Sequence, residues 1–213
     1  ETLITGIGQG YIQTTPIQLC LMTAQLANGG FKIYPKIVLD PNQETVEEIK
    51  SKMLSEVETN EEDIKSRFNS GIFFGDESKK YQALFRNKEN VKFVLNAMFR
   101  STNEVYGTSF SSRIEDPKYQ FAGKTGTAQV KRITEAEREL DLETNQIPYK
   151  QRDHAWFIAF GPYKKPRYAM SILVEHGGSG SKAAAPIAKK LFKLVIDRHE
   201  MREKLKKNNS VKI

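Results

Sequence analysis

The chain has 213 residues, of which 38% are hydrophobic, 28% charged and 10% aromatic, and its formal net charge is +7. Such a composition is typical of a globular protein and argues against wholesale disorder, and the length suits one domain or a large fragment of one. No apolar run reaches the ~18 residues that a membrane-spanning helix needs. The single cysteine, Cys20, excludes an internal disulfide framework and a multi-cysteine zinc site. Because the first residue is Glu1 rather than Met, we expect the chain to be cut from a longer protein.

The first two predicted elements are helices. Thr15 is placed to cap a helix that has Pro16 in its first turn and ends at Asn28-Gly29-Gly30. This helix has so few polar positions that we expect it to be buried. A second helix is predicted from Glu89 to Thr102, because four apolar residues follow the spacing of one helix face: Val91, Val94, Leu95 and Met98.

Three extended segments follow. Residues 119–130 change from the helical to the extended pattern, and the apolar runs 154–160 and 167–174 are joined by a turn that contains both local prolines, which predicts a hairpin. Because the two hairpin runs are too apolar to be edges, we expect residues 119–130 to form an exposed edge strand. The fold class predicted is mixed α/β, with an antiparallel sheet flanked by helices.

The last predicted element is a helix with an apolar face, made of Ala184, Ile187, Ala188, Leu191, Leu194 and Val195. It continues as a basic C-terminal helix and tail over residues 196–213. No Phe, Trp or Tyr interrupts this tail, so we interpret it as a solvated face and expect no nucleic-acid partner. Residues 40–63, with nine acids against two lysines, and the charged, patternless residues 131–153 are predicted to be surface excursions.

The stretch FAGKTGTAQV at residues 121–130 is the most informative about chemistry. Lys124, Thr125 and Thr127 place an ammonium and two hydroxyls close together, and Gly126 lets another backbone approach. Such a strand suits an extended substrate that carries a carboxylate, through charge, aimed hydrogen bonds and main-chain pairing. On these residues alone, a glycine bulge on an edge strand protected by lysine is the better explanation of the pattern.

Further segments bring in a resemblance. GIGQGYIQTTPIQL at residues 6–19, GKTGTAQV at 123–130, HAWFIAFGPY at 154–163 and the stretch 167–178 ending VEHGG together resemble the C-terminal part of a class B penicillin-binding protein. Within that family the chain is most similar to the penicillin-binding protein 2 group, the elongation transpeptidases. The resemblance covers most of residues 1–195 in the family's order, and residues 40–88 and 131–152 match least.

The resemblance implies a partial penicilloyl-serine transferase fold, with residues 1–213 as the C-terminal part of a transpeptidase domain. The family's site combines S-x-x-K, S-x-N and K-T/S-G motifs, of which only the third is convincingly present. By resemblance, Lys124 is the catalytic motif lysine, Thr125, Gly126 and Thr127 bind substrate, and the Thr127 N–H contributes to the oxyanion hole. No cofactor and no metal are implied. The first two motifs would lie upstream of Glu1, so we expect this chain to be inactive alone.

Two segments satisfy the missing motifs in the wrong order. Ser179-Gly180-Ser181-Lys182 fits S-x-x-K and Ser101-Thr102-Asn103 fits S-x-N, but both come at positions that the family does not use. We interpret the first as a connection from strand to helix and the second as the end of a helix. His154 and Trp156 are interpreted as structural rather than catalytic, and for Arg152-Asp153 a place beside the substrate groove and a structural role both remain open.

The whole enzyme is expected to cross-link peptidoglycan stem peptides ending in D-Ala-D-Ala during cell-wall elongation and to bind β-lactams. The resemblance also implies the periplasmic face of the bacterial inner membrane and membrane partners of the cell-elongation machinery. Two alternatives stay open: a related serine D,D-carboxypeptidase or β-lactamase, which would share the K-T-G strand, and a non-catalytic binding module that uses the edge strand or the basic tail.

Overall fold

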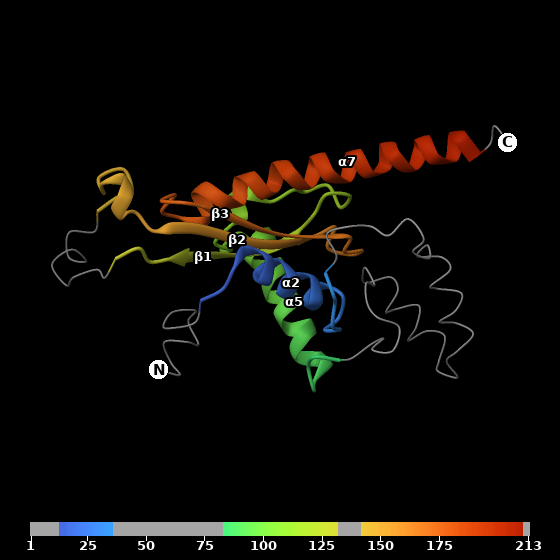
Figure 1. The fold of residues 1–213 in the computed structure, drawn as a ribbon, viewed down its shortest axis with the longest axis horizontal. Helices are drawn as coiled ribbons and strands as arrows, with labels where there is room; N and C mark the ends of the chain where they lie inside the picture. Colours follow the sequence, from blue (N-terminus) through green and yellow to red (C-terminus); the bar gives the residue numbers. More distant parts are fainter. Residues whose placement is uncertain (1–12, 36–82, 132–141, 211–213) are drawn as a thin grey trace.

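The computed structural model describes residues 13–35, 83–131 and 142–210, with side chains as far as residue 205. The predicted segment 40–63, residues 6–12 and residues 132–141 lie outside this part of the chain. The order helix, helix, three strands, helix is confirmed (Figure 1), with these bounds: α2 (Pro16–Ala27), α5 (Lys88–Asn103), β1 (Ala122–Ala128), β2 (His154–Gly161), β3 (Tyr168–Val174) and α7 (Ala185–Ser210). None of the helices described here is long and apolar enough to cross a bilayer.

The three strands form one antiparallel sheet in the order β1-β2-β3. Thr125 pairs with Phe157, and Phe157 pairs in turn with Ile172. The antiparallel sheet and the position of β1 at its edge are confirmed for the described residues. The argument that both apolar strands lie inside the sheet is wrong for β3, which has a single strand neighbour among those residues. The side chains of a strand point to the two faces of the sheet. An apolar strand therefore indicates that both faces of the sheet are covered, and it does not indicate that the strand has a neighbouring strand on each side.

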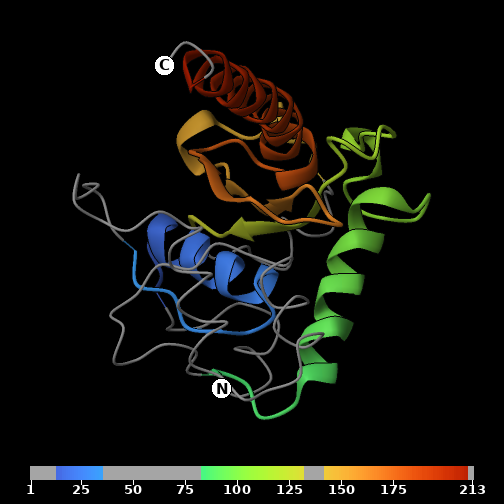
Figure 2. The ribbon, with the colours of Figure 1, turned by 90° about the vertical axis from the view of Figure 1, so that its right-hand side faces the viewer.

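Helices cover both faces of the sheet. Figure 2 shows α7 above the strands, α2 below them and α5 beside β1. The period of two along β2 divides its side chains between these layers: Ala155, Phe157 and Ala159 pack in the cluster that includes α7, whereas Ile158 and Phe160 pack in the cluster that includes α2 and α5. β2 therefore lies at the centre of the core.

The first helix begins as its sequence predicts. Thr15 Oγ1 accepts a hydrogen bond from the Gln18 N–H, and the Gln18 side chain accepts one from the Thr15 N–H, which is a complete capping box. The expectation that α2 is buried all round is wrong, because Ile17 and Met22 are exposed. The helix covers the sheet with one side only.

The inward face of the last helix also differs from the prediction. Ala184, Ala188, Phe192 and Ile196 are buried, whereas Ile187, Leu191 and Leu194 are exposed. The chain enters α7 through a π-helical turn, η4 (Gly180–Ala184). Small alanines at the start of the helix let its backbone approach the sheet closely. The prediction is therefore confirmed for Ala184 and Ala188 and wrong for Ile187, Leu191 and Leu194, which lie on a neighbouring side of the helix.

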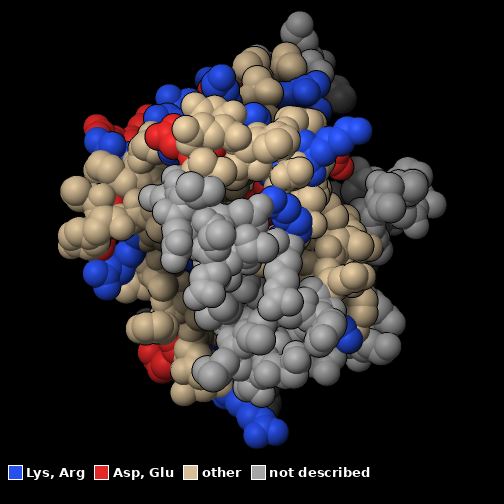
Figure 3. All heavy atoms as spheres, turned by 90° about the vertical axis from the view of Figure 1, so that its left-hand side faces the viewer, with Lys and Arg blue, Asp and Glu red and all other residues tan. Residues whose placement is uncertain are grey.

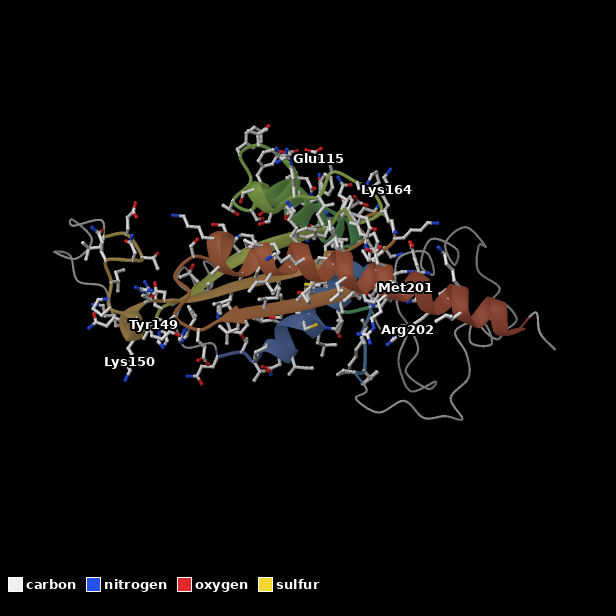
Figure 4. The ribbon with its side chains drawn as sticks, turned by 90° about the horizontal axis from the view of Figure 1, so that it is seen from above. Glu115, Tyr149, Lys150, Lys164, Met201 and Arg202 are labelled. Carbon is white, nitrogen blue, oxygen red and sulfur yellow. The ribbon has the colours of Figure 1, made fainter. Side chains whose placement is uncertain are left out.

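Two shorter segments lie outside the sheet and the long helices. The turn before β1 is held to α7, because Tyr119 Oη and Lys118 Nζ donate hydrogen bonds to Asp197 Oδ1 at 2.5 and 3.0 Å. The predicted excursion 131–153 contains a short 3-10 helix, η3 (Tyr149–Gln151). The sequence did not predict this helix, because residues 131–153 show no periodic pattern. Tyr149 and Met201 lie towards opposite ends of the molecule, and α7 continues beyond the sheet (Figure 4).

Candidate active-site strand

The K-T-G residues lie in the middle of β1. Lys124 and Thr127 are exposed, and Thr125 and Gly126 are half-buried. Because neighbouring residues of a strand face opposite sides, Lys124 and Gly126 share one face of the sheet, and Thr125 and Thr127 share the other. The sequence-predicted site residues are therefore brought together on one strand but divided between its faces.

The outer edge of β1 is closed at its beginning and open further along. Asn103 Nδ2 donates to Phe121 O at 2.9 Å, and Thr102 Oγ1 donates to Gly123 O at 3.5 Å. In an antiparallel strand the N–H and C=O of a residue point to the same side and alternate between neighbouring residues. The peptide groups of Thr125 and Thr127 therefore also point away from β2, beyond the end of α5. This part of the edge can pair with an extended ligand.

The side chain of Lys124 lies along this open edge. Its Nζ donates to Thr125 O at 2.8 Å and contacts Thr125 Oγ1 at 3.4 Å. The ammonium has three donors, of which these two contacts engage two, so one remains available to an anionic ligand. Lysine charge, threonine hydroxyls and outward peptide groups therefore meet within four residues.

Glycine is required where β1 crosses the aromatic core. A Cβ on Gly123 would lie 2.3 Å from Phe157 Cζ and 2.8 Å from Ile158 O. A Cβ on Gly126 would meet only Trp156 Cβ, at 3.2 Å. Gly123 is thus fixed by packing, whereas Gly126 has a single neighbour, the Cβ of Trp156.

A group of hydroxyl residues next to Thr125 was missed by the sequence reasoning. Thr108 Oγ1 lies 3.3 Å from Thr125 Oγ1, and Ser101 Oγ lies 3.2 Å from Thr108 Oγ1. No periodic pattern marks these residues, because the loop after α5 folds back on the helix end. The available signal was the stretch from 108 to 112, in which four of five residues are serine or threonine.

Both wrong-order motifs have structural roles. Asn103 closes the end of α5 by donating to Phe99 O and Phe121 O, each at 2.9 Å. Ser179 and Ser181 contact each other through their hydroxyls at 2.9 Å, and a Cβ on Gly180 would lie 2.4 Å from Trp156 O. The interpretation of 179–182 as a connection from β3 to α7, and of 101–103 as a helix end, is confirmed.

The histidines and the Arg152-Asp153 pair brace the end of the strand. His154 Nδ1 accepts a hydrogen bond from the His176 N–H at 2.9 Å, and Asp153 Oδ1 accepts one from the Val130 N–H at 3.2 Å. Arg152 Nε donates to Ile147 O at 2.8 Å, so its guanidinium is directed into its own loop. Trp156 is half-buried beside Gly126 rather than fully inside the core.

Two further kinds of site to consider are a metal centre and a charged patch. In the described part of the chain, no three His, Cys, Asp or Glu residues are grouped so that they could hold a metal ion. On the face shown in Figure 3, lysine and arginine side chains are interspersed with uncharged residues and do not form one continuous patch. The concentration of functional groups on β1 is therefore the strongest candidate for a site.

Comparisons with known proteins agree with the fold and identify the family. The penicillin-binding protein transpeptidase domain family matches residues 1–193. The chain is 30% identical to the peptidoglycan D,D-transpeptidase MrdA of Salmonella typhimurium over 197 residues, which are 92% of this chain and 27% of that protein.

Solved structures give the same result. Penicillin-binding protein 2 of Helicobacter pylori, in a complex with MreC, is 30% identical with a TM-score of 0.56, over 91% of this chain and 27% of that one. The Pseudomonas aeruginosa protein in complex with WCK 5153 is 30% identical with a TM-score of 0.57, over 91% of this chain and 33% of that one. The chain thus spans about a third or less of these relatives. It belongs to the penicillin-binding protein transpeptidase domain family.

Proposed function

We propose that β1 forms the substrate-carboxylate side of the active site of a peptidoglycan D,D-transpeptidase, and that the chain is the C-terminal part of that enzyme's transpeptidase domain. The observation that carries the proposal is the open edge at Thr125 and Thr127, with the Lys124 ammonium beside it, in a chain of this family. A stem peptide ending in D-Ala-D-Ala is an extended strand with a terminal carboxylate, which fits such an edge.

Each group has a part in binding this substrate. Lys124 supplies the positive charge that attracts the carboxylate, and the hydroxyls of Thr125 and Thr127 supply hydrogen bonds to it. The outward N–H of Thr127 is placed to stabilise the negative oxygen that develops when the neighbouring carbonyl is attacked. Gly126 leaves the face that it shares with Lys124 free of a further side chain.

The nucleophile is proposed to come from an S-x-x-K serine elsewhere in the enzyme. Its Oγ attacks the carbonyl carbon of the penultimate D-Ala, the peptide C–N bond breaks, and the terminal D-Ala leaves after its nitrogen takes up a proton. The amine of a second stem peptide then attacks the ester, forms the cross-link and returns the proton to the serine. A β-lactam opens its ring C–N bond in the first step and remains attached.

On this account, the 213 residues bind and orient substrate but do not react alone. The enzyme is proposed to act on the periplasmic face of the bacterial inner membrane with membrane partners of cell elongation. The complex of the related Helicobacter pylori protein with MreC supports such a partner.

The test uses the enzyme that contains this chain, incubated with a D-Ala-D-Ala donor stem and a second stem that carries a free amine. We expect released D-Ala together with cross-linked dimer, separated by liquid chromatography and mass spectrometry. D-Ala without dimer would identify a carboxypeptidase, steady hydrolysis of penicillin would identify a β-lactamase, and no reaction with either substrate would favour a binding module. Each of these three results contradicts the proposal.

A further inference from the structure

A row of three hydroxyl groups leads from the end of α5 to the K-T-G strand. Ser101 Oγ lies 3.2 Å from Thr108 Oγ1, which lies 3.3 Å from Thr125 Oγ1. These residues come from a helix, a loop and a strand that are separated by up to 24 positions in the sequence. Their meeting is therefore a property of the fold rather than of a local turn.

The chemistry of the neighbours gives this row a direction. Lys124 can only donate, so its contact of 3.4 Å uses an acceptor site on Thr125 Oγ1. A hydroxyl has a single proton, and Thr125 must keep that proton for a substrate carboxylate. Its contact with Thr108 is then one in which Thr108 donates, and Thr108 in turn accepts from Ser101. The row runs from Ser101 through Thr108 to Thr125, and each bond polarises the next.

Thr108 is held in place by the loop around it. The next residue, Ser109, is fully buried, and both its N–H and its hydroxyl donate to Ser101 O at 3.0 Å. A Cβ on Gly107 would lie 2.3 Å from the same carbonyl oxygen, so the loop lies directly against the helix end. α5 itself is tied to β1 through Thr102 and Asn103. Thr108 therefore has a fixed position relative to the strand.

We propose that Thr108 is a positioning residue, which holds the Thr125 hydroxyl in the orientation that donates to the substrate carboxylate. A threonine side chain otherwise exchanges among staggered χ1 rotamers, only one of which points the hydroxyl at this acceptor. The inference rests on the proposed function, because it assigns Thr125 to carboxylate binding. Its consequence is specific: loss of the Thr108 hydroxyl weakens binding of the carboxylate and leaves the chemical step at the serine unchanged.

The experiment compares Thr108→Val, which keeps the shape and removes the hydroxyl, with Thr108→Ser, which keeps the hydroxyl, in the enzyme that contains this chain. Stopped-flow acylation gives the dissociation constant and the acylation rate constant separately, for benzylpenicillin and for its methyl ester. We expect Thr108→Val to weaken benzylpenicillin binding about 3- to 10-fold, the effect of one hydrogen bond between uncharged groups. The acylation rate constant of Thr108→Val and its dissociation constant for the methyl ester should stay near the wild-type values. Both constants of Thr108→Ser should also stay near wild type. Thr14→Val, at an exposed threonine ahead of α2, is the matched control.

A double-mutant cycle with Thr125→Val completes the test, since the effect of Thr108→Val should disappear when Thr125 has no hydroxyl. Equal losses for penicillin and its ester, a loss in the rate constant alone, or an unchanged effect in the Thr125→Val background would overturn the inference.

A wild-type enzyme that penicillin does not acylate would instead overturn the proposed function. In that case, three-bond couplings of the Thr125 methyl carbon, measured by NMR in the 213-residue chain, still test whether Thr108 fixes the rotamer of Thr125. We expect the couplings to show one Thr125 rotamer in wild type and in Thr108→Ser, and an average over several rotamers in Thr108→Val. Identical couplings in all three chains would refute the positioning role.

Discussion

Lys124 and Thr125 are joined by a hydrogen bond within the motif itself, since the ammonium of Lys124 lies 2.8 Å from the carbonyl oxygen of Thr125. That oxygen belongs to the outward edge of β1, so the lysine charge is held beside the peptide groups that an extended substrate would pair with. The motif therefore orients its own cation before substrate arrives.

Removing this cation should slow acylation. For Lys124→Ala in the enzyme that contains this chain, we expect the second-order rate constant for penicillin to fall roughly 10- to 100-fold, because a charge-assisted contact contributes ~1.5 to 3 kcal/mol. Stopped-flow fluorescence measures this rate. Lys182→Ala removes an exposed lysine in the middle of η4 and should leave the rate unchanged. A folded Lys124→Ala enzyme with the wild-type rate would contradict the role of the lysine.

The packing of Gly123 predicts a difference between two glycines of one strand. Gly123→Ala should destabilise the fold by about 1 to 3 kcal/mol, because its Cβ would overlap the Phe157 ring and the Ile158 carbonyl. Gly126→Ala should cost less, since only Trp156 Cβ lies near. Urea unfolding of both variants measures the difference, and equal midpoints would show that the strand can shift to make room.

The aromatic cluster beneath α7 should carry much of the stability. Phe192 is fully buried and stacks on Phe121 with 4.9 Å between ring centroids. Phe192→Ala should therefore cost about 3 to 5 kcal/mol. Leu194→Ala, two positions away on the same helix, should cost less than about 0.5 kcal/mol because Leu194 is 61% exposed. Thermal unfolding of the pair would show the opposite order if the sequence-predicted face of α7 were the buried one.

The type and order of the elements could be predicted from the sequence, whereas the choice between helix faces could not. Apolar residues occur on two sides of α7, and Leu191 and Leu194 fit a 3.6-residue period as well as Ala188 and Phe192 do. The deciding factor is the close approach of small alanines to the sheet, which depends on tertiary packing. The K-T-G residues were found because chemistry and resemblance mark them, but Thr108 reaches Thr125 only through a folded loop.

The contact between the turn before β1 and α7 should make stability depend on pH in the acid range. Hydrogen bonds from Tyr119 and Lys118 lower the pKa of Asp197 below its ordinary value of 3.8. The ionised carboxylate thus stabilises the fold at pH above the ordinary pKa, and this contribution is lost as pH falls through the lower folded-state pKa. Asp197→Asn should flatten the fall in unfolding free energy as the pH drops below the ordinary carboxyl pKa.

Glu175→Gln serves as the charge-matched control, because Glu175 is exposed in the turn after β3. Chemical unfolding at several pH values measures both variants against wild type. If Glu175→Gln flattened the profile as much as Asp197→Asn, the effect would belong to net charge rather than to the Asp197 hydrogen bonds.

The central claim is that these 213 residues supply the carboxylate-binding strand of a transpeptidase site whose serine lies outside them. Intact-mass spectrometry after incubation with benzylpenicillin tests it most directly, on the chain alone and on the chain joined to the upstream part of its own gene. The account predicts no adduct on the chain alone and one penicilloyl group per molecule on the longer protein, at an upstream S-x-x-K serine. A stoichiometric adduct on the 213-residue chain, mapped to Ser179 or Ser181, would contradict it.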